Sequence, residues 1–145
     1  MLISDKYENL PNIKRVVVLG NFDGVHLGHT KLINTSAQLA RQLGIKNCVY
    51  TFQRHRHLDT PGFCGLITDN PEKTEVISHM DVDTLFFDNF NSIKNLSCEE
   101  FCKKILVEKL GCEVAVCGKN YSFGKNRSGD SACLKLSLKS LEKQP

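Results

Sequence analysis

Short apolar runs that alternate with helical patterns constrain the fold of this chain more than any other feature. The first run, residues 15–19 (RVVVL), is rich in β-branched side chains, and similar runs follow at residues 46–52, 84–87 and 113–117. Runs of this kind are typical of central strands in a parallel sheet that is covered on both faces. They predict four parallel strands.

Helices are predicted between these strands. Apolar residues recur at helical spacing over residues 29–43 and Gly44 follows as a stop; Asn70 is the expected N-cap of a helix over 70–80, with Pro71 in its first turn. A capping-box pattern predicts a helix over 97–110, and a last helix is expected from about residue 130, with Leu134, Leu138 and Leu141 on one face. The alternation predicts an α/β fold, a Rossmann-like doubly wound parallel sheet with right-handed crossovers.

Length and composition indicate one ordinary globular domain. The 145 residues suffice for a single core, and the 41% hydrophobic and 24% charged shares are typical of globular proteins. No apolar run approaches the ~20 residues of a membrane span, and the charged N-terminus does not fit a secretion signal, so we expect a cytoplasmic protein that does not enter a membrane. The net charge of +3 suits a phosphate-bearing substrate, and without a Lys/Arg block we expect no nucleic-acid partner.

The seven cysteines do not suggest a disulfide framework or a zinc ribbon. Their number is odd, and no pair has the spacing of a C-x-x-C motif. Cys48 and Cys117 fall inside apolar runs, where a thiol behaves as a small buried hydrophobe. We therefore expect most cysteines to be reduced and to pack in the core.

The segment GNFDGVHLGH, residues 20–29, carries the chemistry. It follows the first strand, where ligands of open α/β sheets bind, and it leads into a helix whose free N–H groups attract anions. His26 and His29 would present two donors to one phosphate, a resource suited to phosphoryl or nucleotidyl transfer. The segment is neither a Walker A loop nor a dinucleotide fingerprint, and a zinc site that also uses His55 and His57 is conceivable as an alternative.

Residues 20–29 resemble the H-x-G-H signature of nucleotidylyltransferases, in the form typical of bacterial FAD synthetases. The likeness continues at Thr51-Phe52 with His55, at 67–73 (ITDNPEK), at 96–101 (LSCEEF) and at 118–130 (GKNYSFGKNRSGD). It implies an FMN adenylyltransferase, which transfers AMP from ATP to FMN with Mg²⁺ and gives FAD and pyrophosphate. By the same resemblance, His26 and His29 are the catalytic residues that contact the ATP phosphates.

The resemblance also implies two sets of binding residues, and no protein metal ligand is assigned. Asp23 would lie close to the reacting phosphates. The expected nucleotide-binding residues are Gly20, Asn21, Phe22, Asp23 and Gly28. The expected flavin- or substrate-binding residues are Thr51, His55, Lys73, Asn120, Tyr121, Phe123 and Arg127. Loop packing is the competing interpretation for Tyr121 and Phe123, and a solvated helix lysine for Lys73.

The chain departs from the family pattern at several positions. Arg54 and Arg56 replace prolines around His55, and Asn120 replaces an acid. The second nucleotide motif, S-S-T-x-I-R, and a riboflavin kinase domain are not found, so we expect one nucleotidylyltransferase-like domain over 1–145 that is C-terminally short, with a sheet edge that a homodimer could cover. Two alternatives stay open: a flavin- or nucleotide-binding module without turnover, and a related transferase acting on another phosphorylated substrate, such as glycerol phosphate or phosphopantetheine.

Overall fold

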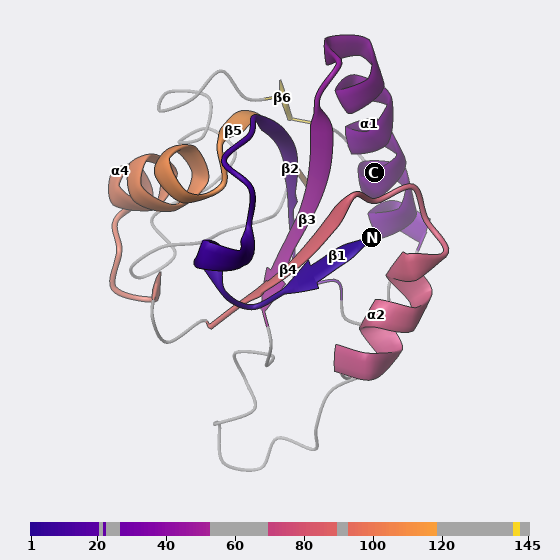
Figure 1. Cartoon of the computed structure of the whole chain (residues 1–145), viewed down its shortest axis with the longest axis horizontal. Coiled ribbons are helices and arrows are strands. Elements are labelled where there is room, and N and C mark those ends of the chain that lie inside the picture. Colours follow the sequence, from indigo (N-terminus) through magenta and orange to yellow (C-terminus); the bar gives the residue numbers. More distant parts are fainter. Residues whose placement is uncertain (21, 23–26, 53–69, 90–92, 119–140, 143–145) are drawn as a thin grey trace.

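A six-stranded parallel sheet forms the centre of the protein. The computed structural model describes residues 1–20, 22, 27–52, 70–89, 93–118 and 141–142. The strands lie side by side in the order β1-β4-β3-β2-β5-β6, and every neighbouring pair is parallel (Figure 1). Their bounds are Leu2–Ser4 (β1), Arg15–Leu19 (β2), Lys46–Phe52 (β3), Thr84–Asp88 (β4), Cys112–Cys117 (β5) and Leu141–Glu142 (β6).

The strand order creates a reversal beside β2. From β2 the chain adds β3 and β4 on one side, and then returns to place β5 on the other side of β2. Leu19 pairs with Tyr50 of β3 and with Cys117 of β5, so the carboxyl ends of these three strands meet at one edge of the sheet. In open α/β sheets, ligands bind outside the carboxyl ends of the strands at such a switch point. We call this side the carboxyl edge and the opposite side the amino edge.

Helices cover both faces of the sheet, as Figure 1 shows. Helices α1 (Leu27–Leu43) and α2 (Asn70–Ser78) lie on one face, where Ile33 and Ile77 join one core cluster with Val16, Val18 and Val49. On the other face, α4 (Cys98–Glu100) continues into η2 (Phe101–Lys109), and a short turn of helix, η1 (Tyr7–Asn9), lies near the edge strands. The predicted α/β, Rossmann-like sheet with helices on both faces is confirmed.

The four strands predicted from apolar runs are confirmed. Two match the predicted bounds, β4 extends to Asp88, and β5 begins at Cys112. Helix α1 begins two residues before the predicted start, and Gly44 and Gly111 follow their helices with φ of 69° and 62°. Strand β1 and the turn η1 were not predicted.

Two helix predictions are wrong in part. The capping box of Ser97 and Glu100 is present, but only Cys98–Glu100 is α-helical and Phe101–Lys109 forms a π-helix, in which the N–H of Leu110 donates to the carbonyl of Ile105. Leu141, expected on a helix, lies in β6 and pairs with Val116. The pattern of side chains shows where a helix begins, but it does not show whether each N–H bonds to the fourth or the fifth residue before it. The remainder of the predicted last helix lies outside the described residues.

Arg15 closes the amino edge beside the end of η2. Its side chain is 1% exposed, and its guanidinium donates to the carbonyls of Pro11, Ile13 and Leu110 at 2.6, 3.2 and 3.0 Å. Its Nε has no hydrogen-bond partner among the described residues. A cation at the carboxyl end of a helix interacts favourably with the unpaired carbonyls there, so this buried charge stabilises the junction between the chain before β2 and η2.

The described cysteines are buried. Cys48, Cys102, Cys112 and Cys117 are free thiols in the core cluster under η2. Burial raises the pKa of Cys48 to about 12, against the opposing effect of Arg15; burial together with Cys48 and Cys102 raises the pKa of Cys112 to about 12. Cys48 and Cys112 therefore stay protonated at neutral pH, and all four thiols pack in the core, as predicted. Cys98 takes part in a disulfide, which was not predicted.

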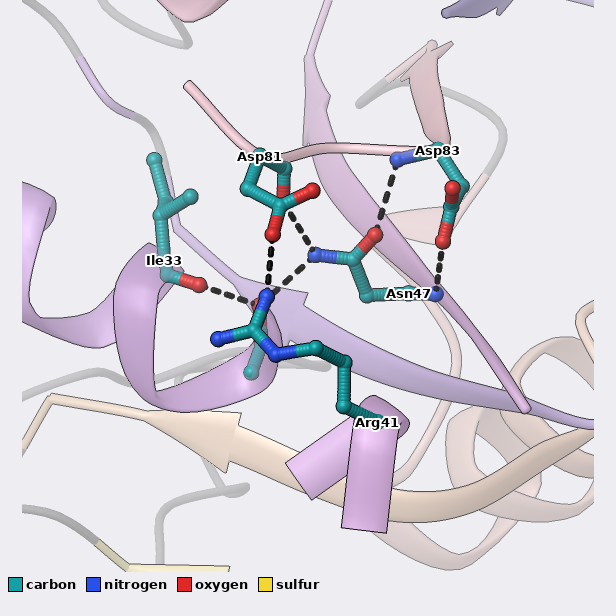
Figure 2. A network of polar contacts seen from close by, with 6 residues as sticks. Ile33, Arg41, Asn47, Asp81 and Asp83 are labelled. Atoms are coloured by element: carbon teal, nitrogen blue, oxygen red, sulfur yellow. Dashed lines mark hydrogen bonds and ion pairs between the residues drawn. The ribbon is translucent and has the colours of Figure 1, made fainter. Parts of the chain in front are cut away.

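A polar network joins three segments at the amino edge, as Figure 2 shows. The Asn47 side chain is 1% exposed and donates to the Ser36 hydroxyl at 3.2 Å and to the Asp81 carbonyl at 2.9 Å. Its own carbonyl accepts from the N–H of Asp83 at 2.8 Å, and its backbone N–H donates to the Asp83 carboxylate at 3.0 Å. One amide therefore fastens α1, the start of β3 and the approach to β4.

Candidate functional site

The candidate site lies at the carboxyl edge, where β2 and β5 end. Gly20 follows β2 and Gly118 follows β5, directly after the paired residues Leu19 and Cys117. A Cβ at Gly118 would lie 3.7 Å from Cδ1 of Leu32, so the end of β5 lies against α1. The switch point, the two strand ends and the first turns of α1 therefore come together, as residues 20–29 predicted.

His29 is the described candidate catalytic residue. It is the third residue of α1 and is half-buried. Its imidazole lies edge-to-face against the ring of Phe22, with centroids 5.0 Å apart and planes at 73°. A half-buried imidazole in the first turn of a helix lies where the helix N-terminus favours negative charge, so it can donate to an anion there. His26 lies outside the described residues.

Phe22 is a buried part of the core. Its side chain is 0% exposed and joins the cluster of Leu32 and Ile33 under α1. The ring is therefore not available for contact with a ligand. The ring lies beneath the site.

Thr51 and Lys73 meet at the carboxyl end of β3. Thr51 is fully buried, and Lys73 on α2 is 2% exposed, with its Nζ donating to the Thr51 hydroxyl at 3.3 Å. The interpretation of Lys73 as a solvated helix lysine is wrong, because α2 presses this side chain onto β3. Burying the ammonium of a lysine is costly unless polar groups surround it. The buried position of Lys73 beside the site is therefore not explained by packing alone.

Sequence reasoning missed a buried carboxylate at the end of β4. Asp88 is 5% exposed, and its Oδ2 accepts hydrogen bonds from the hydroxyls of Tyr7 and Tyr50, both at 2.5 Å. Its Oδ1 accepts from the N–H of Asn89 at 2.8 Å. Burial, with Asp88 adding to it, raises the pKa of Tyr7 well above its usual range, so this phenol remains a donor. The signal was an acid directly after an apolar strand at the ligand edge.

The remaining predicted residues are divided between described and undescribed parts of the chain. Gly28 is the second residue of α1, and Gly20 is buried at the end of β2. The following lie outside the described residues: Asn21, Asp23, His26, His55, Asn120, Tyr121, Phe123 and Arg127. Their roles stay predictions, as does the alternative zinc site of His26, His29, His55 and His57.

A hollow of about 350 Å³ lies at the amino edge, away from these residues. It is lined by the end of α1, by the turn into β3 and by Asp81 and Asp83. Four residues of the polar network in Figure 2 line it, namely Arg41, Asn47, Asp81 and Asp83, and Arg41 and Asp81 form an ion pair with side chains 62% and 66% exposed. Because these polar groups bond to one another at the wrong end of the strands, we do not place the site there.

A family model for FAD synthetase matches residues 9–144, nearly the whole chain. The chain belongs to the FAD synthetase family. The match includes every strand from β2 to β6 and the residues at the carboxyl edge. The resemblance seen in residues 20–29 thus extends over the whole domain.

Curated relatives agree with the FAD synthetase assignment. A bifunctional riboflavin kinase/FMN adenylyltransferase of Buchnera aphidicola subsp. Schizaphis graminum is 32% identical over 127 residues, 86% of this chain and 41% of the relative. A protein of the same name from Listeria monocytogenes is 34% identical over 81% of this chain and 38% of the relative. The chloroplastic FAD synthetase 1 of Arabidopsis thaliana is 31% identical over 81% of this chain and 33% of the relative. The chain spans less than half the length of these relatives.

A solved structure supports the fold independently. The crystal structure titled macrolide-efflux protein from Streptococcus pneumoniae superposes with a TM-score of 0.82 at 20% identity, covering 99% of this chain and 49% of that one. At this identity the likeness concerns the fold alone. Among the described residues, no helix is long and apolar enough to cross a bilayer.

Proposed function

We propose that this FAD synthetase domain transfers AMP from ATP to FMN. A phosphate oxygen of FMN attacks the α-phosphorus of ATP, a new P–O bond forms, and the bond from that phosphorus to the β-phosphate oxygen breaks, so the products are FAD and pyrophosphate. The observation that carries the proposal is the position of His29, in the first turn of α1 and beside the switch point of β2 and β5.

His29 would stabilise charge on the phosphoryl oxygens during transfer. Phosphoryl transfer requires little covalent help, and positioned donors are the main resource that a protein supplies. The side chain is half-buried, so part of its surroundings is protein rather than water, which strengthens a hydrogen bond to an anion. His26 would act beside it as the second donor.

Lys73 and Thr51 would form the substrate side of the site. Lys73 brings a positive charge to the end of β3, next to β2 in the sheet. Such a charge fits the phosphate of FMN, and Thr51 fixes its position. The undescribed Asn120, Tyr121, Phe123 and Arg127 are proposed to complete the flavin side.

The family implies Mg²⁺, and the buried carboxylate at this edge does not fit it. Asp88 accepts three hydrogen bonds from protein donors, two at Oδ2 and one at Oδ1, and the side chain is 5% exposed, so three of its roughly four lone-pair sites are already taken. Mg²⁺ bound by one or two carboxylates and substrate phosphates would depend on Asp23, outside the described residues.

The test is to incubate the chain with ATP, Mg²⁺ and FMN and to quantify FAD and pyrophosphate by chromatography. We expect FAD, and we expect His29→Ala to lower kcat by about 10²- to 10³-fold, the usual loss for one such donor. His79→Ala is the matched control, because His79 is exposed after α2 and pairs with Glu75. FMN or ATP binding without FAD would support the binding module instead. Pyrophosphate released only with another phosphorylated acceptor would support the related transferase.

A further inference from the structure

Phe22 is held in an unfavourable backbone conformation. Its φ is 56°, and among the described residues it is the one non-glycine residue with a positive φ. For a bulky side chain this region is a genuine outlier, since Cβ comes too close to the backbone. Strain of this kind persists only where the surroundings enforce it, and it concentrates at functional sites.

The strain puts the Phe22 ring under His29. The ring is fully buried in the core below α1, and the imidazole lies edge-to-face against it at 5.0 Å. Edge-to-face geometry is the favoured arrangement of two aromatic rings, because the positive edge of one meets the negative face of the other. The contact therefore restrains the rotation of the imidazole.

Gly20 leaves the space that the ring occupies. A Cβ at this position would lie 2.8 Å from Cζ and 2.9 Å from Cε2 of Phe22, closer than real Cβ contacts allow. The backbone of Gly20 continues the sheet, with its N–H donating to the Tyr50 carbonyl at 3.3 Å. Position 20 is thus fixed by the sheet, and a side chain there would displace the ring.

We propose that Phe22 is a positioning residue for His29, seated by the missing side chain of Gly20. This inference rests on the proposed function, in which His29 donates to the transferred phosphoryl group. A displacement of about 1 Å at a positioned group can cost as much as 10²-fold in rate. Phe22 acts on the transition state through His29 and does not touch the nucleotide with its ring.

The test uses Phe22→Leu, Gly20→Ala and the double variant, with ¹³C-labelled histidine. We expect Phe22→Leu to lower kcat about tenfold or more while KM for ATP stays within about twofold, and to move the His29 ring signals, assigned with His29→Gln. Gly20→Ala should give a similar loss by pushing the ring away. In the double variant the two losses should not add, because both remove one contact.

Phe101→Leu is the matched control. Phe101 is also 0% exposed, but it lies in η2 on the opposite face of the sheet, against Tyr50. It should lower the melting temperature without moving the His29 signals or the kcat of the folded protein. If Phe22→Leu and Gly20→Ala behave like Phe101→Leu, or if their losses simply add, the positioning role is overturned.

The two proposals fail separately. If the unsubstituted chain makes no FAD, the proposed function fails, and the His29 side-chain rotamer, measured by three-bond couplings, then decides whether Phe22 positions the imidazole. An unchanged rotamer in Phe22→Leu and Gly20→Ala would reject the positioning role, and a changed or averaged rotamer in both would support it. Full FAD formation by Phe22→Leu would reject the positioning role while leaving the proposed function intact.

Discussion

The two edges of the sheet use polar side chains in different ways. At the amino edge, the Asn47 amide donates twice and accepts once, and all three of its partners belong to the protein. At the carboxyl edge, Lys73 is buried and donates to the Thr51 hydroxyl. His29 packs against the ring of Phe22, a residue whose backbone has a strained positive φ. The first arrangement closes the fold. The second keeps charged and donating groups in place at the end where ligands bind, at a cost in stability.

This difference predicts that substitution of Asn47 at the amino edge lowers stability, whereas substitution of Lys73 at the carboxyl edge lowers activity. The largest effect is expected for Asn47→Ala, which leaves the N–H of Asp83 and the carbonyl of Asp81 without their partner. Both groups are partly buried, and a group of this kind left unpaired costs near the lower end of about 1–3 kcal/mol, so we expect the free energy of unfolding to fall by about 2–3 kcal/mol. Urea unfolding measures this. Asn95→Ala, at an exposed position, is the control, and an unfolding energy no lower than that of this control would contradict the closing role.

Lys73→Met tests the carboxyl edge with the opposite expectation. Replacing a buried charge by an apolar side chain of similar length is often neutral or stabilising, so the melting temperature should hold or rise. A hydrogen bond to a charged group contributes about 1.5–3 kcal/mol, so the FAD-forming kcat/KM for FMN should fall by about 10- to 100-fold. Lys31→Met on the exposed side of α1 is the matched control. Unchanged kinetics together with a lower melting temperature would make Lys73 structural.

Tyr7→Phe is expected to cost less, about 1–2 kcal/mol of unfolding free energy. It removes one of the two phenols on Asp88 while the ring keeps its contact with Phe86, at 4.6 Å between centroids. Asp88 retains the hydroxyl of Tyr50, so the carboxylate is not left unpaired. Comparison with Tyr50→Phe and with the double variant would show whether the two losses of unfolding free energy add or whether the two hydrogen bonds are coupled.

The same residue predicts a pH dependence. Burial raises the pKa of Tyr7 above its ordinary value of 10.0, so the unfolded chain loses this proton first as pH rises. The stability that Tyr7 contributes is therefore complete below about pH 10 and is lost progressively above it. The slope of unfolding free energy against pH in that range should be smaller in Tyr7→Phe. An equal slope in both proteins would mean that another group causes it.

Sequence reasoning located the central strands and the candidate site because these depend on local patterns. The β-branched run before Gly20 and the helical spacing after His29 define a strand and a helix without knowledge of the rest of the fold. Together they place His29 at a carboxyl edge, since every parallel strand that leads into a helix ends there.

Features that depend on distant partners could not be predicted in the same way. Strand β1 is three residues long with Leu2 and Ile3 exposed, and it exists because it pairs with β4. The burial of Lys73 follows from the docking of α2 on β3. The contact of Phe22 with His29 requires a positive φ that a phenylalanine does not signal.

Arg41→Ala should have the smallest effect on the free energy of unfolding. It tests whether the exposed ion pair or the buried Asn47 amide stabilises the amino edge. Arg41 and Asp81 form an ion pair with side chains 62% and 66% exposed, and pairs of this kind contribute about 0–1 kcal/mol. Asp81 would still hold Asn47 through its backbone carbonyl, which the substitution leaves in place. We therefore expect Arg41→Ala to lower the free energy of unfolding, measured with urea, by less than about 1 kcal/mol. The loss should be smaller still in high salt, which screens the pair. A loss as large as that of Asn47→Ala would show that the exposed pair, and not the buried amide, closes this edge of the sheet.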